Sequence, residues 1–527
     1  MKNLIIISLI LITQTIFSQQ QNLPLGTTYR QQISFEINKR DIAINTGFKP
    51  LLKSEINTVI NTDTVLYNLK VRENFFKKHK ENWFWPVLLF DDFVTVEKKN
   101  FNLYVNPLFY LEAGRFSHKN LFTTEDYYIN TRAIEIKGDI GKKLSFYSSF
   151  RENQTKLQPH VYNWSFNRLV VPGQGALKRN FKNLSLFDFS SAAAYLSYTP
   201  NSWVNIQIGQ DKNFIGEGHR SLLLSDNSTN YPFAKFSFTY KSFKYLTMFT
   251  EFRDFSHVYF SYHTKKHGAF NYLSYNYKNR FEIGLFEGVI YKTTDTTQGY
   301  YNKFKADYFI PVIGVRTASN GFNSSNNNII AGINAKAKIT NFIQAYWQLA
   351  IDNPSQNKMA YQAGFKVFDL LHGKLENHNL YFQTEYNFAN PRTYSHENYI
   401  YQTWSHYNQE LAHPAGSSFN EILLNARYNF KNIFLEYNFS KLKLNVNYQY
   451  SNIYMTDYKV ASSSFLPSPY SVFHNTITAG YIVNRRTNLQ VYTSIDFRTE
   501  KQNTGTGKTR FVMFGLKTAL SNFYYDF

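Results

Sequence analysis

The sequence contains no cysteine, and this absence excludes several kinds of protein chemistry. Disulfide bonds, thiol catalysis and cysteine-ligated zinc all need that residue, and so does a lipid anchor on an N-terminal cysteine. Long apolar runs are also scarce. The apolar stretch from Leu4 to Ile12 spans nine residues, whereas a membrane-spanning helix needs about 20, and no later stretch is long enough. Any span across a membrane must therefore use elements other than helices.

The first 18 residues have the layout of a secretory signal peptide. Lys2 gives a short positive start, the apolar stretch follows, and Ser18 precedes a glutamine-rich segment. We expect cleavage after Ser18, although Ile16 stands where a small residue is usual. The mature chain is therefore expected to act outside the cytoplasm.

Aromatic side chains are abundant, whereas the mean hydropathy is low. Phe, Tyr and Trp make up 18% of the chain, and the mean hydropathy is −0.41. That combination indicates a wall that is apolar on one face only. The 527 residues are enough for about two to four soluble domains or for one large barrel.

From Phe101 onward, apolar and polar residues alternate with a period of two. The stretch 441–450 alternates over its whole length, with Leu442 and Leu444 on one face and Lys441 and Lys443 on the other. About twenty such segments follow one another, separated by clusters of Asn, Asp, Gly, Lys and Ser.

Two architectures produce this pattern: stacked soluble β-sandwiches, or one transmembrane barrel. The segments run to about ten residues, longer than typical sandwich strands, and aromatic residues gather at their ends as in membrane girdles. The final residues, SNFYYDF, place Phe523, Tyr525 and Phe527 on one face, like the last strand that signals assembly of outer-membrane barrels. We predict an all-β fold, a large antiparallel transmembrane β-barrel of about 18 strands over residues 101–527.

Residues 19–100 do not alternate. The stretch GTTYRQQISFEINKRD has helical spacing after a threonine cap, and KVRENFFKKHKENWFW is basic and aromatic. We predict a small, partly helical N-terminal segment that lies in the periplasm or plugs the lumen. A few extra strands with poor patterning are the alternative.

Motifs that suggest catalysis or metal binding fail on their spacing. Residues Thr504–Thr509 read TGTGKT, but Gln502 stands where a phosphate-binding loop needs glycine, and a strand follows instead of a helix. His263 and His267, four residues apart on a strand, lie too far apart to share one ion. The ingredients of a serine–histidine lipase are present without a distinctive spacing. We predict no catalytic residue, no metal site, no cofactor and no enzyme activity.

The interruption between Asn390 and Phe419 is rich in aromatic, amide and imidazole groups. Such groups suit sugar rings, whose apolar faces stack while their hydroxyls form hydrogen bonds. Our candidates for polysaccharide binding are Tyr399, Trp404, His406 and Tyr407. An aromatic girdle with a packed loop is the alternative interpretation.

The net charge of +20 indicates an anionic neighbour. Acidic polysaccharide and the phosphates of lipopolysaccharide both qualify. Nucleic acid would match the charge, but an exported barrel argues against it.

A second interruption, FIGEGHRSLLLSDNSTNYP (214–232), is too long for a tight turn. Leu222, Leu223 and Leu224 cannot all sit on one water-facing surface, so we predict that the loop folds into the lumen. The candidates for organising it are structural: Glu217, Arg220, Asp226 and Asn227. We expect Arg220 to pair with Glu217 or Asp226.

The longer stretch GQDKNFIGEGHRSLLLSDNSTNYP resembles the signature of the capsule assembly Wzi family, in the branch that includes the gliding-motility protein RemB. His219 departs from it, standing where an aromatic residue is expected before the Arg-Ser pair. The resemblance spans most of the mature chain in order. Further matching pieces lie at 44–50, 127–154, 171–178 and 406–421.

This resemblance implies a non-enzymatic outer-membrane barrel of a Gram-negative cell that assists the assembly or attachment of capsular polysaccharide. The motility branch implies surface adhesion and gliding instead, and a transport pore is the alternative from another class. Expected partners are outer-membrane lipid and lipopolysaccharide, the surface polysaccharide and, during biogenesis, the barrel assembly machinery.

Overall fold

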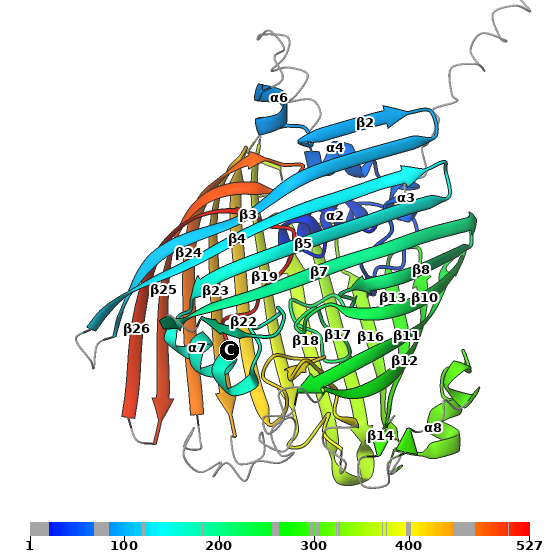
Figure 1. Cartoon of the computed structure of the whole chain (residues 1–527). Coiled ribbons are helices and arrows are strands. Elements are labelled where there is room, and N and C mark those ends of the chain that lie inside the picture. The colour runs from blue at the N-terminus through cyan, green and yellow to red at the C-terminus, as the bar shows by residue number, and fades with distance from the viewer. Residues whose placement is uncertain are drawn as a thin grey trace, which may run out of the picture.

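A closed β-barrel dominates the computed structural model (Figure 1). Eighteen antiparallel strands form its wall in the part of the chain that the structure describes, and β26 pairs with β3 to close it. The predicted barrel of about 18 strands is therefore confirmed. The described residues are 20–67, 84–118, 123–180, 183–255, 263–292, 294–295, 300–301, 306–322, 324, 327–371, 373–375, 377–396, 402–445, 470–503 and 505–527.

The wall strands follow one another around the barrel in chain order. They are β3 (Phe101–His118), β4 (Thr123–Ile140), β5 (Leu144–Lys156), β7 (Asn183–Asn201), β8 (Val204–Asp211), β10 (Tyr231–Tyr240), β11 (Phe243–Phe255), β12 (His263–Tyr277), β13 (Phe281–Lys292), β16 (Asn327–Lys338), β17 (Ile343–Asn353), β18 (Lys358–Val367), β19 (His378–Ala389), β22 (Phe419–Phe430), β23 (Ile433–Leu444), β24 (Tyr470–Asn484), β25 (Leu489–Gln502) and β26 (Gly505–Thr518).

Shorter elements lie beside the wall or in the connections. Two of them extend the wall sheet: β2 (Val94–Lys98) pairs with β3, and β6 (Lys178–Asn180) pairs with β7. The others are β1 (Phe48–Lys49), β9 (Phe214–Ile215), β14 (Thr294–Asp295), β15 (Tyr300–Tyr301), β20 (Ser405–His406), β21 (Gln409–Glu410), α7 (Pro159–Arg168), η1 (Ala306–Phe309), α8 (Val315–Asn320) and η2 (Pro354–Gln356).

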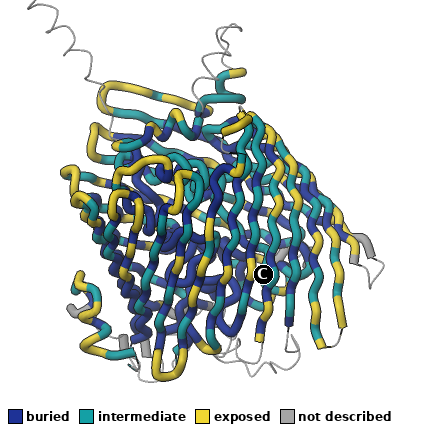
Figure 2. Tube along the Cα trace, turned by 180° about the vertical axis from the view of Figure 1, so that it is seen from behind, coloured by how far each residue is buried: buried dark blue, intermediate teal, exposed yellow. Residues whose placement is uncertain are grey.

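The alternation in sequence becomes an alternation between lipid and lumen. On β23, Ile433 and Leu435 are exposed on the outer face, whereas Phe434 between them is buried. The same face stays buried towards the end of the strand, where Leu442 and Leu444 are buried and Lys443 between them is exposed. Apolar side chains therefore line the lumen at that level. Figure 2 shows buried and exposed positions alternating along the strands.

The two ends of the barrel have different connections. At one end the strands join by tight turns, such as 278–280 between β12 and β13, where Lys278 and Asn279 both have a positive φ. At the other end lie long connections, including 212–230 and 390–418. Outer-membrane barrels have short turns at one end and long loops at the other, and this barrel shows the same difference.

The N-terminal segment is partly helical and lies at the short-turn end of the barrel (Figure 1). Its helices are α2 (Thr27–Asn38), α3 (Lys53–Asn57), α4 (Thr62–Tyr67) and α6 (Phe84–Leu89). Tyr29 and Ile33 of α2 pack with Ile56, Leu66 and the wall residue Leu108 in one buried cluster. None of the helices in the described ranges is long and apolar enough to cross a membrane. The predicted signal peptide, residues 1–18, lies outside the described residues.

The last nine residues, 519–527, leave the wall after β26 and turn back into the lumen (Figure 1). The predicted terminal strand with Phe523, Tyr525 and Phe527 on one face is therefore wrong. The segment contacts the interior instead: Tyr524 donates a hydrogen bond to Asp226 (2.7 Å), and Asp526 pairs with Arg220 (2.8 Å). We call residues 519–527 the tail.

Candidate functional site

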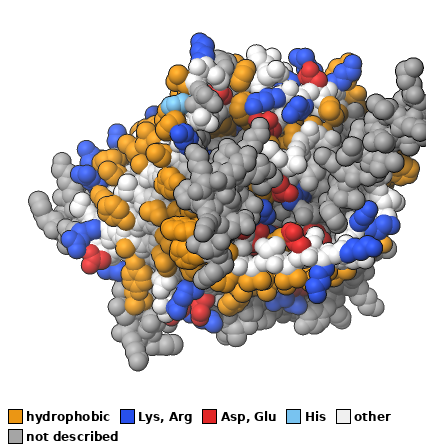
Figure 3. Space-filling view, turned by 90° about the horizontal axis from the view of Figure 1, so that it is seen from above, with side chains coloured by type: hydrophobic (Ala, Val, Ile, Leu, Met, Phe, Trp, Pro, Cys, Tyr) orange, Lys and Arg blue, Asp and Glu red, His pale blue; other side chains and the backbone are white. Residues whose placement is uncertain are grey.

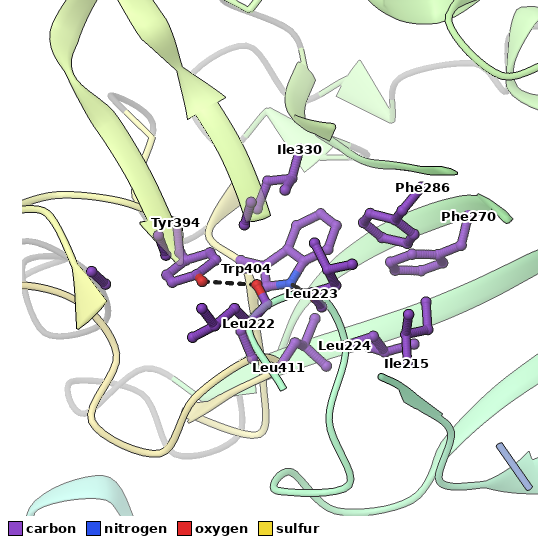
Figure 4. Close-up of a cluster of buried hydrophobic side chains, with 14 of the residues drawn as sticks. Ile215, Leu222, Leu223, Leu224, Phe270, Phe286, Ile330, Tyr394, Trp404 and Leu411 are labelled. Carbon is purple, nitrogen blue, oxygen red and sulfur yellow. Dashed lines mark hydrogen bonds between the residues drawn. The ribbon is translucent and has the colours of Figure 1, made fainter. Parts of the chain in front are cut away.

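Residues 212–230, which we call the lumen loop, leave the wall after β8 and return at β10. Leu222, Leu223 and Leu224 are completely buried in the largest apolar cluster of the protein (Figure 4). The carbonyl of Leu222 accepts a hydrogen bond from the hydroxyl of Tyr394 (2.8 Å), and that of Leu223 accepts one from the indole of Trp404 (2.9 Å). The three leucines therefore face other loops and the inner wall, as their sequence requires.

The partner of the lumen loop is the connection 390–418, which we call the aromatic loop. Trp404 is 1% exposed, and its ring packs edge-on against Phe270 (5.4 Å between centroids) and Phe286 (6.3 Å) of the wall. This contact ties the aromatic loop, the lumen loop and the strands β12 and β13 together. The sequence did not show that Trp404 would serve packing.

The four predicted sugar-binding residues do not form one open face. His406 is buried like Trp404: its Nδ1 accepts from the backbone N–H of Arg253 (3.0 Å), and its Nε2 lies 3.2 Å from the carbonyl of Asn230. Burial lowers the pKa of His406 to about 3, so the ring is neutral. Tyr407 is partly exposed, and Tyr399 lies outside the described residues. The burial of Trp404 and His406 leaves them no free ring face for a sugar.

The four predicted lumen-loop residues are all buried, but the partner of Arg220 is a correction. Arg220 pairs neither with Glu217 nor with Asp226. Its guanidinium lies 3.2 Å from Glu421 of β22 and 2.8 Å from Asp526 of the tail. Both partners are far away in sequence, which is why local spacing did not reveal them.

Glu217 faces a group of lysines on the other side of the loop. Its carboxylate lies 3.4 Å from Lys49, 3.6 Å from Lys366 and 4.0 Å from Lys336. Burial alone would raise the pKa of Glu217, but the three ammonium groups outweigh it and hold that pKa at about 2. The loop is therefore fixed by a buried carboxylate that stays ionised.

This pKa predicts an acid-dependent loss of stability. Because the pKa of Glu217 falls from 4.5 to about 2 on folding, its contribution to stability is present above about pH 4.5 and disappears as pH falls towards 2. We expect Glu217→Gln to be less stable than the wild type at pH 6, with the difference narrowing below pH 4.5. Urea titrations of vesicle-embedded protein between about pH 3 and 7 measure the difference in unfolding free energy between the two proteins. A difference that does not change with pH would contradict this interpretation.

The other two lumen-loop residues connect the loop to the tail and the aromatic loop. Asp226 accepts hydrogen bonds from Tyr524 (2.7 Å) and from Asn522 (2.9 Å). The side chain of Asn227 donates to the carbonyl of Glu410 (3.0 Å), whose own carboxylate pairs with Arg168 at the end of α7. Three connections and the tail are thus joined through buried polar groups.

His219 shows how the chain accommodates its departure from the expected aromatic residue. Its ring packs edge-on against Tyr524 of the tail, with 5.5 Å between centroids. Burial, together with the neighbouring Arg220, lowers the pKa of His219 to about 4, so the ring is neutral at physiological pH. The imidazole therefore takes the place of the expected aromatic ring in the contact between the lumen loop and the tail.

A polar cavity of about 270 Å³ lies between this packed interior and the wall strands β3 to β8. Lys53 and Arg486 line it towards the N-terminal segment, and Gln174 and Asn230 line it towards the lumen loop. Figure 3, seen from the short-turn end, shows apolar side chains along the outer rim and charged ones inside. Within the described ranges, no cluster of three or more His, Asp or Glu residues is placed to hold a metal ion.

Comparison with known proteins places the fold. No family model and no curated protein matches the sequence. Among solved structures, the chain is similar to Wzi, an outer-membrane protein involved in group 1 capsule assembly in Escherichia coli and described as a carbohydrate-binding β-barrel. The TM-score is 0.56 at 10% identity, over 93% of this chain and 98% of that one. The fold is that of a Wzi-like outer-membrane barrel.

Porins are more distant matches. A BenF-like porin from Pseudomonas fluorescens gives a TM-score of 0.42 at 8% identity, over 80% of this chain and 99% of that one. OccAB2 of Acinetobacter baumannii gives a TM-score of 0.41 at 11% identity, over 78% of this chain and 97% of that one. At 10% identity, the likeness to Wzi establishes the fold alone.

The polar contacts of this Wzi-like barrel carry one signal that sequence reasoning missed. Lys336 and Lys366 occupy polar positions within otherwise alternating strands, and both side chains are buried around Glu217. The charge of a lysine on the lumen face of a strand must be compensated, either by water in the lumen or by a buried acidic side chain. The loop that supplies the acid is more than a hundred residues away, so the pairing becomes visible only in three dimensions.

Proposed function

We propose that this Wzi-like barrel is a non-enzymatic outer-membrane protein that helps to assemble or retain capsular or other surface polysaccharide at the cell surface. The observation that carries the proposal is the packed interior on the long-loop side. There the lumen loop, the aromatic loop and the tail are locked together by Trp404, Arg220 and Asp226. Such an interior makes the outer end a rigid platform. Export with cleavage after Ser18, contact with lipopolysaccharide and insertion by the barrel assembly machinery belong to the same proposal.

In this proposal the sugar contacts lie on the outer surface of the aromatic loop. Trp404 anchors the loop from inside, and Tyr407, three residues later and partly exposed, follows it at the surface. Tyr399 is the second aromatic residue proposed for stacking. The excess positive charge of +20 favours an acidic polysaccharide.

The test is binding to polysaccharide purified from the cells that make the protein. We expect saturable binding by the wild type, and about tenfold weaker binding by the double variant Tyr399→Ala/Tyr407→Ala, because two stacking contacts are lost. The matched control is Tyr481→Ala, which removes an exposed tyrosine near the short-turn end. Unchanged affinity in the double variant would move the site away from these tyrosines. No binding by the wild type would overturn the proposal.

A transport pore is the second candidate, and the polar cavity beside β3 to β8 favours it. A cavity of about 270 Å³ between the N-terminal segment and the lumen loop suits a small hydrophilic solute. Planar-bilayer recording separates the two functions. A barrel sealed by its loops gives little or no current, whereas a pore gives stable single-channel steps that change with salt.

A gliding-motility role of the RemB type is the third candidate, and it rests on the motif 209–232. Deleting the gene and comparing capsule staining with spreading on agar separates the two outputs. Loss of capsule with normal spreading supports the polysaccharide role, and the reverse supports the motility branch.

A further inference from the structure

One connection folds over the outside of the wall instead of into the lumen. Residues 306–322, which we call the outer segment, contain η1 and α8 and lie against the outer face of the barrel (Figures 1 and 2). Tyr308 stacks on Tyr291 of β13, with 3.4 Å between centroids, and Phe309 packs edge-on against Phe249 of β11 (5.0 Å). Aromatic contacts thus attach the outer segment to two wall strands.

The wall beneath the outer segment carries a polar row where an apolar surface is expected. Thr247, Asn271 and Glu287 are direct neighbours across β11, β12 and β13. They point outward, because Phe270 and Phe286, next to them in sequence, contact Trp404 inside the lumen. A carboxylate on the lipid-facing side of a barrel is costly unless something covers it.

The outer segment is that cover. The backbone N–H and the hydroxyl of Thr317 both donate to Glu287, at 3.0 and 2.7 Å. Arg316, which is buried, lies 3.9 Å from the same carboxylate and donates to the carbonyls of Tyr308 and Ile310 at 2.8 Å each. One oxygen of the Glu287 carboxylate thus accepts two hydrogen bonds from the outer segment, and the buried cation of Arg316 lies beside the carboxylate, so the segment compensates the polar row of the wall.

The opposite face of the outer segment is apolar and uncovered. Residues 309–315 read FIPVIGV, and Phe309, Val312 and Val315 are 53%, 51% and 37% exposed. The run lies next to the lipid-facing wall, because the hydroxyl of Tyr245 on β11 donates to the carbonyl of Pro311 and Phe309 packs against Phe249 of the same strand. An exposed apolar run of this kind marks contact with a membrane or another protein, and its continuity with the wall decides for lipid.

We propose that the outer segment is embedded in the bilayer leaflet on the long-loop side, with acyl chains covering Phe309, Val312 and Val315. The segment then does two things. It shields the polar row at Glu287 from hydrocarbon, and it broadens the apolar girdle of the barrel with an interfacial anchor that is not a strand.

The cysteine-free chain allows a direct test with single labelled positions. Val312→Cys reports the proposed contact, Ser319→Cys is the control on the exposed part of α8, and Phe514→Cys is the reference on the lipid-facing wall. Each variant is labelled with the fluorophore NBD and reconstituted in phosphatidylcholine vesicles with or without doxyl-labelled acyl chains. We expect blue-shifted emission at 312, and quenching about threefold or more greater than at 319 and close to that at 514.

Two results would overturn the proposal. If position 312 matches position 319 in emission and quenching, the outer segment stands in water above the bilayer. If its emission is blue-shifted but the doxyl lipid does not quench it, a second copy of the chain covers the run instead of lipid. Phe309→Cys repeats the measurement at a second exposed residue of the same run, should Val312→Cys refold poorly.

Discussion

Replacing Arg220 by alanine is expected to destabilise the folded barrel by about 3–5 kcal/mol. The substitution removes the cation that lies between Glu421 (3.2 Å) and Asp526 (2.8 Å). Arg220 and Glu421 are both buried, so the carboxylates lose their counterion in a place that water does not reach easily. The substitution also removes the direct ionic contact between the lumen loop and the tail. Urea unfolding in lipid vesicles, followed by circular dichroism, measures the change.

A matched control is available in an exposed pair. Arg115 and Asp126 form an ion pair of similar length, 3.0 Å, but their side chains are 69% and 72% exposed. Arg115→Ala is therefore expected to lower the stability by at most about 1 kcal/mol. Adding Asp526→Asn to Arg220→Ala should recover part of the loss, because one buried charge then disappears. Equal effects of the two arginine substitutions would show that Arg220 does not lock the interior.

Trp404→Ala is the second substitution for which we expect a large effect, about 3–5 kcal/mol. The indole fills the space between Leu223, Phe270 and Phe286, and its N–H satisfies a buried carbonyl. Alanine leaves both a cavity and an unpaired carbonyl, so the lumen loop loses its attachment to the aromatic loop. We expect the same unfolding experiment to show the loss, and limited proteolysis to cut the two loops faster than in the wild type.

Two further tryptophan variants separate the contributions. Trp404→Phe keeps most of the ring volume but loses the hydrogen bond, so an intermediate cost of about 1–2 kcal/mol is expected. Trp203→Ala removes a half-exposed ring at a tight turn, and we expect a cost of about 1 kcal/mol. If Trp404→Ala is no worse than Trp203→Ala, the indole does not hold the loops together.

The wall was predictable because the property that defines it is local. A strand between lipid and lumen must alternate, and each ten-residue segment shows this without knowledge of its neighbours. The burial of Leu222 to Leu224 was predictable for a similar reason, since three consecutive leucines cannot share one water-facing surface. The partly helical start followed from a break in the same alternation.

The contents of the lumen were not predictable in the same way. Arg220 and Asp526 are 306 positions apart, and nothing near either residue in sequence indicates the pairing. Alternating aromatic residues suit a terminal strand and a lumen tail equally well, so Phe523, Tyr525 and Phe527 were misassigned. Composition likewise could not decide whether Trp404 stacks on a sugar or packs against Phe270.

The tail sets an order of events during biogenesis. Arg220 and Asp226 are synthesised long before residues 519–527, which supply Tyr524 and Asp526. The contacts of Arg220 and Asp226 with the tail therefore form only once residues 519–527 are available. Until then, Arg220 and Asp226 lack the partners that Asp526 and Tyr524 supply, so the interior of the barrel depends on the very end of the chain.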